Sequence, residues 1–362
     1  MCGVVCVKVA PAGGGGLEAR WKHGSSARRS RVAVAALQRS VPSWTGTGKK
    51  LYALTEVPRV TSSQQRPPRR LRIGGDLPYF DSRHELRDYV QAFEELGYDH
   101  LGFGEHVLPA RAPNWPSDIS PCEPWHEAFT QAAFVAALTS RIEIAASVLL
   151  PLRPAGIAAK QAAEIDLFSE GRLRLSVSVG WNREEVRALG VDPATRGRLL
   201  EEQVEVMRLL WTEPHVTYRG KLIEIVDVAV NPRPERPVPV WMGGGDFEGG
   251  GVPGPAVLDR MARIADGYKM FGPLMRDVDA GLDVIRRLRA LVAEHGRDPE
   301  DFGIEARIPL QLLPEDAWIE RLETWRRAGA THITLSNRRG AGGANAEIAR
   351  LTRFRELTDG LW

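Results

Sequence analysis

A short unit occurs twice in this chain: the end of a helix, a glycine, two residues, a histidine and then a strand. ELGYDHLGF at Glu95 to Phe103 and RAGATHITL at Arg327 to Leu335 both follow this order, and ARIADGYKMF at Ala262 to Phe271 is similar. Because glycine readily takes the left-handed conformation that ends a helix, each unit joins a helix directly to a strand. Repetition of such units predicts a parallel sheet covered by helices.

Short apolar runs between helical segments predict eight strands. They are expected near Leu71, His100, Ile142, Leu173, Val238, Gly267, Phe302 and His332. Eight strands alternating with helices favour a (β/α)8 TIM barrel. A doubly wound open sheet is the alternative, but the first strand lacks the Gly-x-Gly-x-x-Gly turn of that fold. Val107 to Pro124 and Thr212 to Pro237 are predicted to be insertions at the barrel rim, the second with a short β excursion.

One predicted strand has an unusual inner face. From Arg172 onward, Leu and Val alternate with Arg174, Ser176, Ser178 and Gly180. The alternation predicts a strand with one apolar face and one small, polar face. Trp181 and Asn182 follow at its carboxyl end, where parallel barrels bind their ligands.

Composition sets limits on the function. The net charge of the 362 residues is +2, which gives no general reason to expect a nucleic-acid or membrane partner. No run of 18 apolar residues is present. The three cysteines, Cys2, Cys6 and Cys122, are too few for a disulfide framework and fit a reducing cytoplasm. The scattered histidines form no set with metal-ligand spacing.

Residues 1–70 differ from the rest of the chain. They contain GGGG at Gly13 to Gly16 and the basic clusters ARRSR and QQRPPRR, with little acid and no periodicity. Such a segment cannot bury enough apolar surface to offset its ordering entropy. We therefore expect a disordered extension over 1–70 and one barrel domain over 71–362, and an export signal is disfavoured because its apolar run is too short.

From Leu71 onward the sequence resembles the bacterial luciferase-like oxidoreductases, and within them the branch that uses the deazaflavin coenzyme F420. The resemblance rests on segments that occur in the family's order: ELGYDHLGFGEH (95–106), SRIEIAASVLLPLRP (140–154), AAKQAAEIDLFSEGRLRLSVSVGWNREEVRALGVD (158–192), RGRLLEEQVEVMRLLWTE (196–213), VPVWMGGG (238–245) and RIADGY (263–268). It implies a TIM barrel and redox chemistry on a small organic molecule.

Glu105 and His106 end the second predicted strand. A carboxylate beside an imidazole can form a general acid/base unit, although a structural histidine is an equally good interpretation of the residues alone. The resemblance implies that the pair faces the cofactor ring. Glu105 stands where the family more often has Asp.

Three further segments are implied to bind the cofactor. The family often has a non-prolyl cis peptide at the end of the third strand, which implies a cis bond between Ser147 and Val148 beneath the ring. Gly180, Trp181 and Asn182 would border the ring, with Trp181 in the place of an acid found in sugar-phosphate dehydrogenases. Gly243, Gly244 and Gly245 would cradle a phosphate, although Asp246 and Glu248 follow closely. Arg153, Arg174 and Lys269 could contact phosphate or substrate, but solvation at the surface is the simpler expectation for each.

The resemblance implies hydride transfer between reversibly bound F420 and a small substrate. One alternative is a monooxygenase that uses reduced FMN and oxygen. A second is a cofactor-binding protein without turnover, which the loss of the acid at Trp181 keeps open. A third is a non-redox barrel such as an isomerase, which would need a phosphate site after strands seven and eight. A homodimer stays open.

Overall fold

The structure is a computed structural model that describes residues 70–80, 82–111, 122–245, 250–270, 272–336 and 343–361. The chain divides into two units, Met1–Gln64 and Gln65–Trp362. The expectations for residues 1–69 and for the acidic residues 246 and 248 lie outside the described residues, as does most of the rim insertion at 112–121. The second unit is described below.

The second unit is a closed barrel of eight parallel strands, as the sequence predicts. The barrel order is β1, β10, β9, β8, β7, β4, β3 and β2, and the last strand pairs with the first. Each strand lies near the residue at which it is expected: β1 Arg72–Asp76, β2 His100–Phe103, β3 Glu143–Leu149, β4 Leu173–Ser178, β7 Val240–Gly243, β8 Gly267–Lys269, β9 Gly303–Ile308 and β10 His332–Leu335. The open-sheet alternative is wrong.

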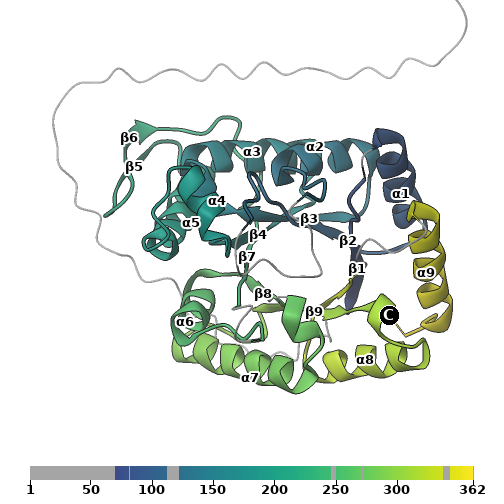
Figure 1. Cartoon of the computed structure of the whole chain (residues 1–362). Helices are drawn as coiled ribbons and strands as arrows, with labels where there is room; N and C mark the ends of the chain where they lie inside the picture. The colour runs from purple at the N-terminus through teal and green to yellow at the C-terminus, as the bar shows by residue number, and fades with distance from the viewer. Residues whose placement is uncertain are drawn as a thin grey trace, which may run out of the picture. The chain divides into compact units, whose positions relative to one another are not determined.

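Helices surround the barrel (Figure 1). They are α1 Arg83–Glu95, α2 Ala128–Leu138, α3 Ala155–Phe168, α4 Arg183–Ala188, α5 Arg196–Thr212, α6 Pro255–Ile264, α7 Val278–Glu294, α8 Asp316–Arg327 and α9 Gly343–Leu357, with 3-10 turns at Leu150–Leu152, Gly272–Met275 and Leu310–Leu312. Gly97 and Gly329 follow two of them at φ of 80° and 83°, which confirms both glycines as helix stops. Among the described residues no helix is long and apolar enough to cross a membrane.

The predicted excursion after α5 is present. β5 Val216–Arg219 and β6 Glu224–Val228 form a two-stranded antiparallel sheet of their own. Glu202 of α5 fixes the connecting turn, because its carboxylate accepts hydrogen bonds from the backbone amides of Lys221, Leu222 and Ile223. The insertion therefore belongs to the outer layer and adds no strand to the barrel.

The two faces of the barrel strands differ in chemistry. Apolar residues such as Ile144 and Leu175 are fully buried on the outer face, among the core residues that pack with the helices. Alternate residues face the interior of the barrel, and many of them are charged, hydroxylated or glycine. The small, polar face predicted for β4 is therefore part of a polar interior.

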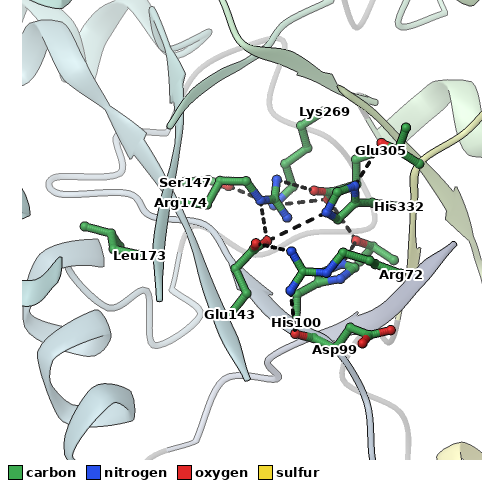
Figure 2. A network of polar contacts seen from close by, with 12 residues as sticks. Arg72, Asp99, His100, Glu143, Ser147, Leu173, Arg174, Lys269, Glu305 and His332 are labelled. Carbon is green, nitrogen blue, oxygen red and sulfur yellow. Dashed lines mark hydrogen bonds and ion pairs between the residues drawn. The ribbon is translucent and has the colours of Figure 1, made fainter. Parts of the chain in front are cut away.

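Arg174 of β4 lies at the centre of this interior network (Figure 2). Its guanidinium contacts Glu143 of β3 at 2.6 Å and Glu305 of β9 at 2.7 Å, and it is 2% exposed. Glu143 also accepts a hydrogen bond from Arg72 at 2.6 Å. Burial alone would raise the pKa of Glu143, but Arg174 and Arg72 outweigh it and lower the pKa to about 2. A buried charge is tolerated only when it is paired in this way, so these contacts connect strands across the barrel.

Both histidines of the repeated unit face the same interior. His100 Nε2 lies 2.9 Å from Thr334 Oγ1, and the rings of His100 and His332 are 5.5 Å apart between centroids. Burial lowers the pKa of His100 to about 3 and that of His332 well below its usual range, so both rings are neutral at pH 7. The repeat thus places uncharged imidazoles beside the ion pairs.

Glycines make room for the large side chain in this layer. Trp241 of β7 lies against the backbone of Gly267 and Gly303, where a Cβ atom on either glycine would overlap its ring. The Arg174 guanidinium carbon lies 4.2 Å from the centroid of the same ring. Trp241 and the two glycines therefore fill this part of the barrel together.

Acid should destabilise the fold before most carboxylates protonate. Between the folded pKa of His100 near 3 and its unburied value of 6.5, the unfolded chain binds more protons. The free energy of unfolding should therefore fall as the pH falls through this range, by up to about 1.4 kcal/mol per pH unit for each buried histidine. Urea unfolding at a series of pH values measures this slope.

His100→Gln should flatten that slope, whereas His84→Gln, at an exposed position of α1, should leave it unchanged. Identical slopes in the wild type and His100→Gln would show that His100 does not carry the effect.

Gly303→Ala should lower the free energy of unfolding by about 1–3 kcal/mol, because the new methyl group overlaps Trp241. Gly156→Ala in α3 is the control, since a Cβ there meets no atom within 4 Å and alanine favours a helix. Denaturant unfolding compares the two. If Trp241→Leu does not reduce the cost of Gly303→Ala, steric overlap is not its cause.

Candidate active site

The carboxyl ends of the eight parallel strands meet at one end of the barrel, which we call the barrel mouth. The segments after β2 and β4 bring His106, Trp181 and Glu185 together there. His106 lies three residues beyond the end of β2, and Glu185 is in the first turn of α4. Both segments leave strands that flank β3, so residues far apart in the sequence come into contact.

His106 forms a buried pair with Glu185. Its Nδ1 lies 2.6 Å from Glu185 Oε2, and the two side chains are 6% and 1% exposed. The ionised carboxylate can only accept a hydrogen bond, so Nδ1 carries a proton and donates it. The pair therefore holds the imidazole in one orientation.

The carboxylate of Glu185 is held in place from several sides. Its Oε1 accepts hydrogen bonds from the backbone amides of Val107 at 2.6 Å and Leu108 at 3.0 Å. Burial alone would raise the pKa of Glu185, but the hydrogen bonds from His106, Leu108 and Val107 outweigh it and lower the pKa. The side chain thus stays ionised and fixes the orientation of the imidazole.

Two tryptophans flank the imidazole. Trp125 and Trp181 meet the His106 ring edge to face, with centroids 4.7 and 5.5 Å away. Trp181 is only partly buried. These contacts restrict rotation of the imidazole and leave an aromatic wall at the barrel mouth.

The structure corrects the expected pairing of Glu105 with His106. The carboxylate of Glu105 accepts two hydrogen bonds from Arg153, at 2.8 and 2.9 Å, and one each from the amides of Leu149 and Ala128. Consecutive residues of an extended segment point to opposite sides, so Glu105 and His106 diverge. Glu105 holds together the ends of β2 and β3 and the start of α2, and it is not the partner of His106.

The expected cis peptide between Ser147 and Val148 is wrong. The bond is trans and lies within β3, where Ser147 pairs with Ser176 and Val148 with Val177. An uninterrupted ladder on β4 keeps the backbone regular. Ser147 faces the barrel interior, where its Oγ accepts a hydrogen bond from Lys269 Nζ at 2.9 Å, and Val148 is buried on the other face.

Two of the other expected cofactor residues, Asn182 and Gly180, have structural roles in the segment after β4. Asn182 is buried and both ends of its amide bind within the protein: Oδ1 accepts from the Glu185 amide at 3.1 Å, and Nδ2 donates to Ala110 O at 2.7 Å. It therefore caps α4 and positions Glu185. Gly180 takes a φ of 76°, which favours glycine at the turn out of β4.

Gly243 ends β7 at the same mouth, Gly244 and Gly245 follow it, and all three are partly exposed. A Cβ at Gly243 would meet only Lys269 O within 4 Å, at 3.5 Å. The backbone here can therefore approach a ligand closely, as the phosphate prediction requires, and that prediction stays open.

Solvation was the simpler expectation for Arg153, Arg174 and Lys269, and it is wrong for all three. Their side chains are 11%, 2% and 10% exposed. Arg153 clamps Glu105, Arg174 links two strands, and Lys269 faces the interior near the mouth.

Sequence reasoning missed the role of Glu185, which lies in the first turn of α4. The available signal was positional: Glu185 and His106 each follow a strand that borders β3. Together they form a buried imidazole whose Nδ1 is held by a carboxylate. The site can therefore assist a reaction in which a substrate gains or loses a proton.

Comparison with known proteins gives the family. The model of the luciferase-like monooxygenases matches residues 53–358, starting upstream of the expected boundary at Leu71. An F420-dependent glucose-6-phosphate dehydrogenase of Amycolatopsis mediterranei is 34% identical over 190 residues, which are 51% of this chain and 52% of the relative. A pyrimidine monooxygenase, RutA, of Allorhizobium ampelinum is 30% identical over 223 residues, 59% of this chain and 56% of the relative.

A solved structure agrees in fold. The monooxygenase RslO1 of Streptomyces bottropensis superimposes with a TM-score of 0.61 at 19% identity, covering 79% of this chain and 98% of that one. The relatives include both an F420-dependent dehydrogenase and a monooxygenase, so the comparisons support an oxidoreductase that acts on a small molecule. With its closed barrel and a match over most of its length, this chain belongs to the luciferase-like monooxygenase family.

Proposed function

We propose that the protein is a cytoplasmic oxidoreductase that transfers a hydride between coenzyme F420 and a small organic substrate. The observation that carries this proposal is the buried His106–Glu185 pair at the barrel mouth. It supplies a directed proton donor and acceptor beside an aromatic wall. Hydride transfer to or from a carbonyl or alcohol requires a proton at the neighbouring oxygen, and this pair can provide it.

The residues around the pair fit a flat, partly anionic cofactor. A Cβ at Gly104, between β2 and His106, would meet no atom of the described residues within 4 Å, so the backbone there is open to a ligand. Trp181 offers a partly exposed indole to a ring, and the glycines after β7 offer backbone amides to a phosphate. We assign ring contact to Gly180 and Trp181 and phosphate contact to Gly243, Gly244 and Gly245. Bound F420 would supply or accept the hydride.

The protein's own residues assist the reaction by transferring a proton. Glu185 holds the Nδ1 proton of His106, which leaves Nε2 to give a proton to the substrate oxygen or take one from it. Glu105 acts at a distance by fixing the backbone from which His106 projects. The two tryptophans limit access of water to the imidazole and so keep its proton for the substrate.

An FMN-dependent monooxygenase is the second candidate. The similarity to the pyrimidine monooxygenase favours it, since that relative is almost as similar as the F420-dependent one. In that case His106 would protonate an oxygenated product. The tryptophan at position 181 also separates this chain from the sugar-phosphate dehydrogenases, so we do not propose a sugar phosphate as the substrate.

Loss of the imidazole should reduce turnover more than binding. His106→Ala should lower kcat by about 10²–10⁴-fold. Glu185→Gln should also lower kcat, by at least about tenfold, because an amide can donate a hydrogen bond to Nδ1 and stabilise the wrong tautomer. Steady-state kinetics with reduced and oxidised cofactor measures kcat, and fluorescence titration measures cofactor affinity.

Glu184→Gln is the matched control, because Glu184 is exposed and, within the described residues, forms its ion pair with Arg187 of its own helix, at 3.4 Å. It should leave kcat unchanged. If His106→Ala weakens cofactor binding and leaves kcat intact, His106 contacts the ring and does not transfer a proton.

Cofactor choice separates the two candidates. F420 carries a phosphate and an anionic glutamate tail, so its binding should be tighter than that of FMN and should weaken with added salt. Equilibrium titrations of both oxidised cofactors at low and high salt measure this. FMN binding at least tenfold more tightly, about 1.4 kcal/mol, would establish the monooxygenase candidate instead.

A further inference from the structure

Lys269 is a buried cation that the proton chemistry of His106 does not use. It is the last residue of β8, so it lies at the mouth end of the barrel interior, with its side chain 10% exposed. Figure 2 shows it beside Ser147 and Glu305, reaching in from a different strand from Arg174. Burying an ammonium group is costly, so its partners show what the site is built for.

The partners of Lys269 are weak for a buried charge. Its Nζ donates to the neutral Ser147 hydroxyl at 2.9 Å, and the nearest carboxylate, Glu305, is 3.8 Å away. Glu305 is already engaged by Arg174 at 2.7 Å and by Thr334 at 2.8 Å. Burial lowers the pKa of Lys269, although Glu305 and Asp76 act in the opposite direction. Among the described residues the ammonium group therefore has an ion pair with Glu305 at 3.8 Å but no carboxylate within hydrogen-bond distance.

The balance of charges in the described interior also shows that Lys269 has no carboxylate of its own. Four cationic side chains, including the partly exposed Arg72, face three carboxylates in the described interior: Arg72, Arg174, Lys269 and Arg307 with Asp76, Glu143 and Glu305. Arg174 contacts two carboxylates, Arg72 contacts Glu143, and Arg307 pairs with Asp76. Lys269 is thus where one further negative charge would be best accommodated.

A second observation points to a ligand at the same place. Ser176 of β4 is 2% exposed, and its Oγ has no hydrogen-bond partner in the described part of the chain. Ser176 pairs in register with Ser147 of β3, and both side chains are on the inner face. The unsatisfied hydroxyl of Ser176 therefore lies on the strand next to the one whose Ser147 contacts Lys269. Gly102 accommodates the ammonium group, because a Cβ there would approach Lys269 Nζ to 3.3 Å and Asp76 Oδ1 to 3.6 Å. Buried polar atoms are normally satisfied, and a bound oxygen would satisfy this one.

We propose that Lys269, Ser147 and Ser176 bind a carboxylate group of the substrate. A carboxylate supplies one negative charge and two oxygens that can each accept hydrogen bonds, which matches one ammonium and two hydroxyl groups. A phosphate dianion would bring more charge than the interior lacks. The assignment of the anion to the substrate rests on the proposed function. The binding of an anion at Lys269 does not depend on that function.

The test uses the full-length protein with lysine labelled by carbon-13 at Cε, in chloride-free buffer of constant ionic strength. Sodium acetate is the probe and acetamide is its neutral control. The signal that disappears in Lys269→Met belongs to Lys269. It should move saturably with acetate and not with acetamide, and acetate should raise the pH at which it titrates.

Variants locate the binding. Ser176→Ala should weaken acetate binding by about threefold or more, and Lys269→Met should abolish acetate-dependent thermal stabilisation. Lys221→Met, at an exposed position, should change neither. Lys269→Met replaces a buried cation by an apolar chain of similar length and should fold. If Lys269→Met does not fold, Ser176→Ala still tests the site.

No acetate-dependent change of the Lys269 signal would overturn the proposal, and so would equal changes with acetamide. Tighter binding of inorganic phosphate than of acetate would contradict the assignment to a carboxylate. The measurement needs neither F420 nor FMN. Acetate binding in a protein that binds neither cofactor would therefore refute the proposed function and leave the anion site standing.

Discussion

The barrel depends on Arg174, a fully buried cation that contacts carboxylates from two other strands. β4 and β3 are neighbours, but β9 lies across the barrel, so the contact with Glu305 joins parts of the sheet that share no backbone hydrogen bonds. Removing one partner of such a set leaves a buried charge uncompensated, at a cost of about 3–5 kcal/mol. Apolar side chains would fill the interior more simply. The polar set instead gives the barrel a charged interior that extends toward its mouth.

The candidate site follows from that geometry. Parallel strands bring the segments after β2 and β4 to one end, and the alternation of side chains turns His106 toward Glu185 while Glu105 turns toward Arg153. The two glutamates thus have separate duties. Glu105 fixes the backbone and Glu185 fixes the imidazole. Lys269 is the last residue of β8 and lies toward the same mouth, so the carboxylate that we propose there would belong to the molecule whose proton His106 exchanges.

Much of the fold could be predicted from local sequence, and less of the site. Short apolar runs between helical segments locate all eight strands, and glycine helix stops mark the approach to β2 and β10, because both signals act within a few residues. Glu185 was missed because its partner is 79 positions away. Arg174 and Lys269 were placed at the surface because charge alone does not reveal which face of a strand is closed by the barrel. The cis bond at Ser147 was inferred from resemblance, and the regular pairing of β3 with β4 rules it out.

The central claim is that Glu185 fixes one tautomer of His106 so that Nε2 is the atom that exchanges a proton. Nitrogen-15 NMR of the histidine side chains tests this most directly, with His106→Gln to assign the signals. The structure predicts that Nδ1 carries a proton in the wild type, and that Nδ1 loses it in Glu185→Gln but not in Glu184→Gln. An Nδ1 without a proton in the wild type, or an Nδ1 proton unaffected by Glu185→Gln, would contradict it.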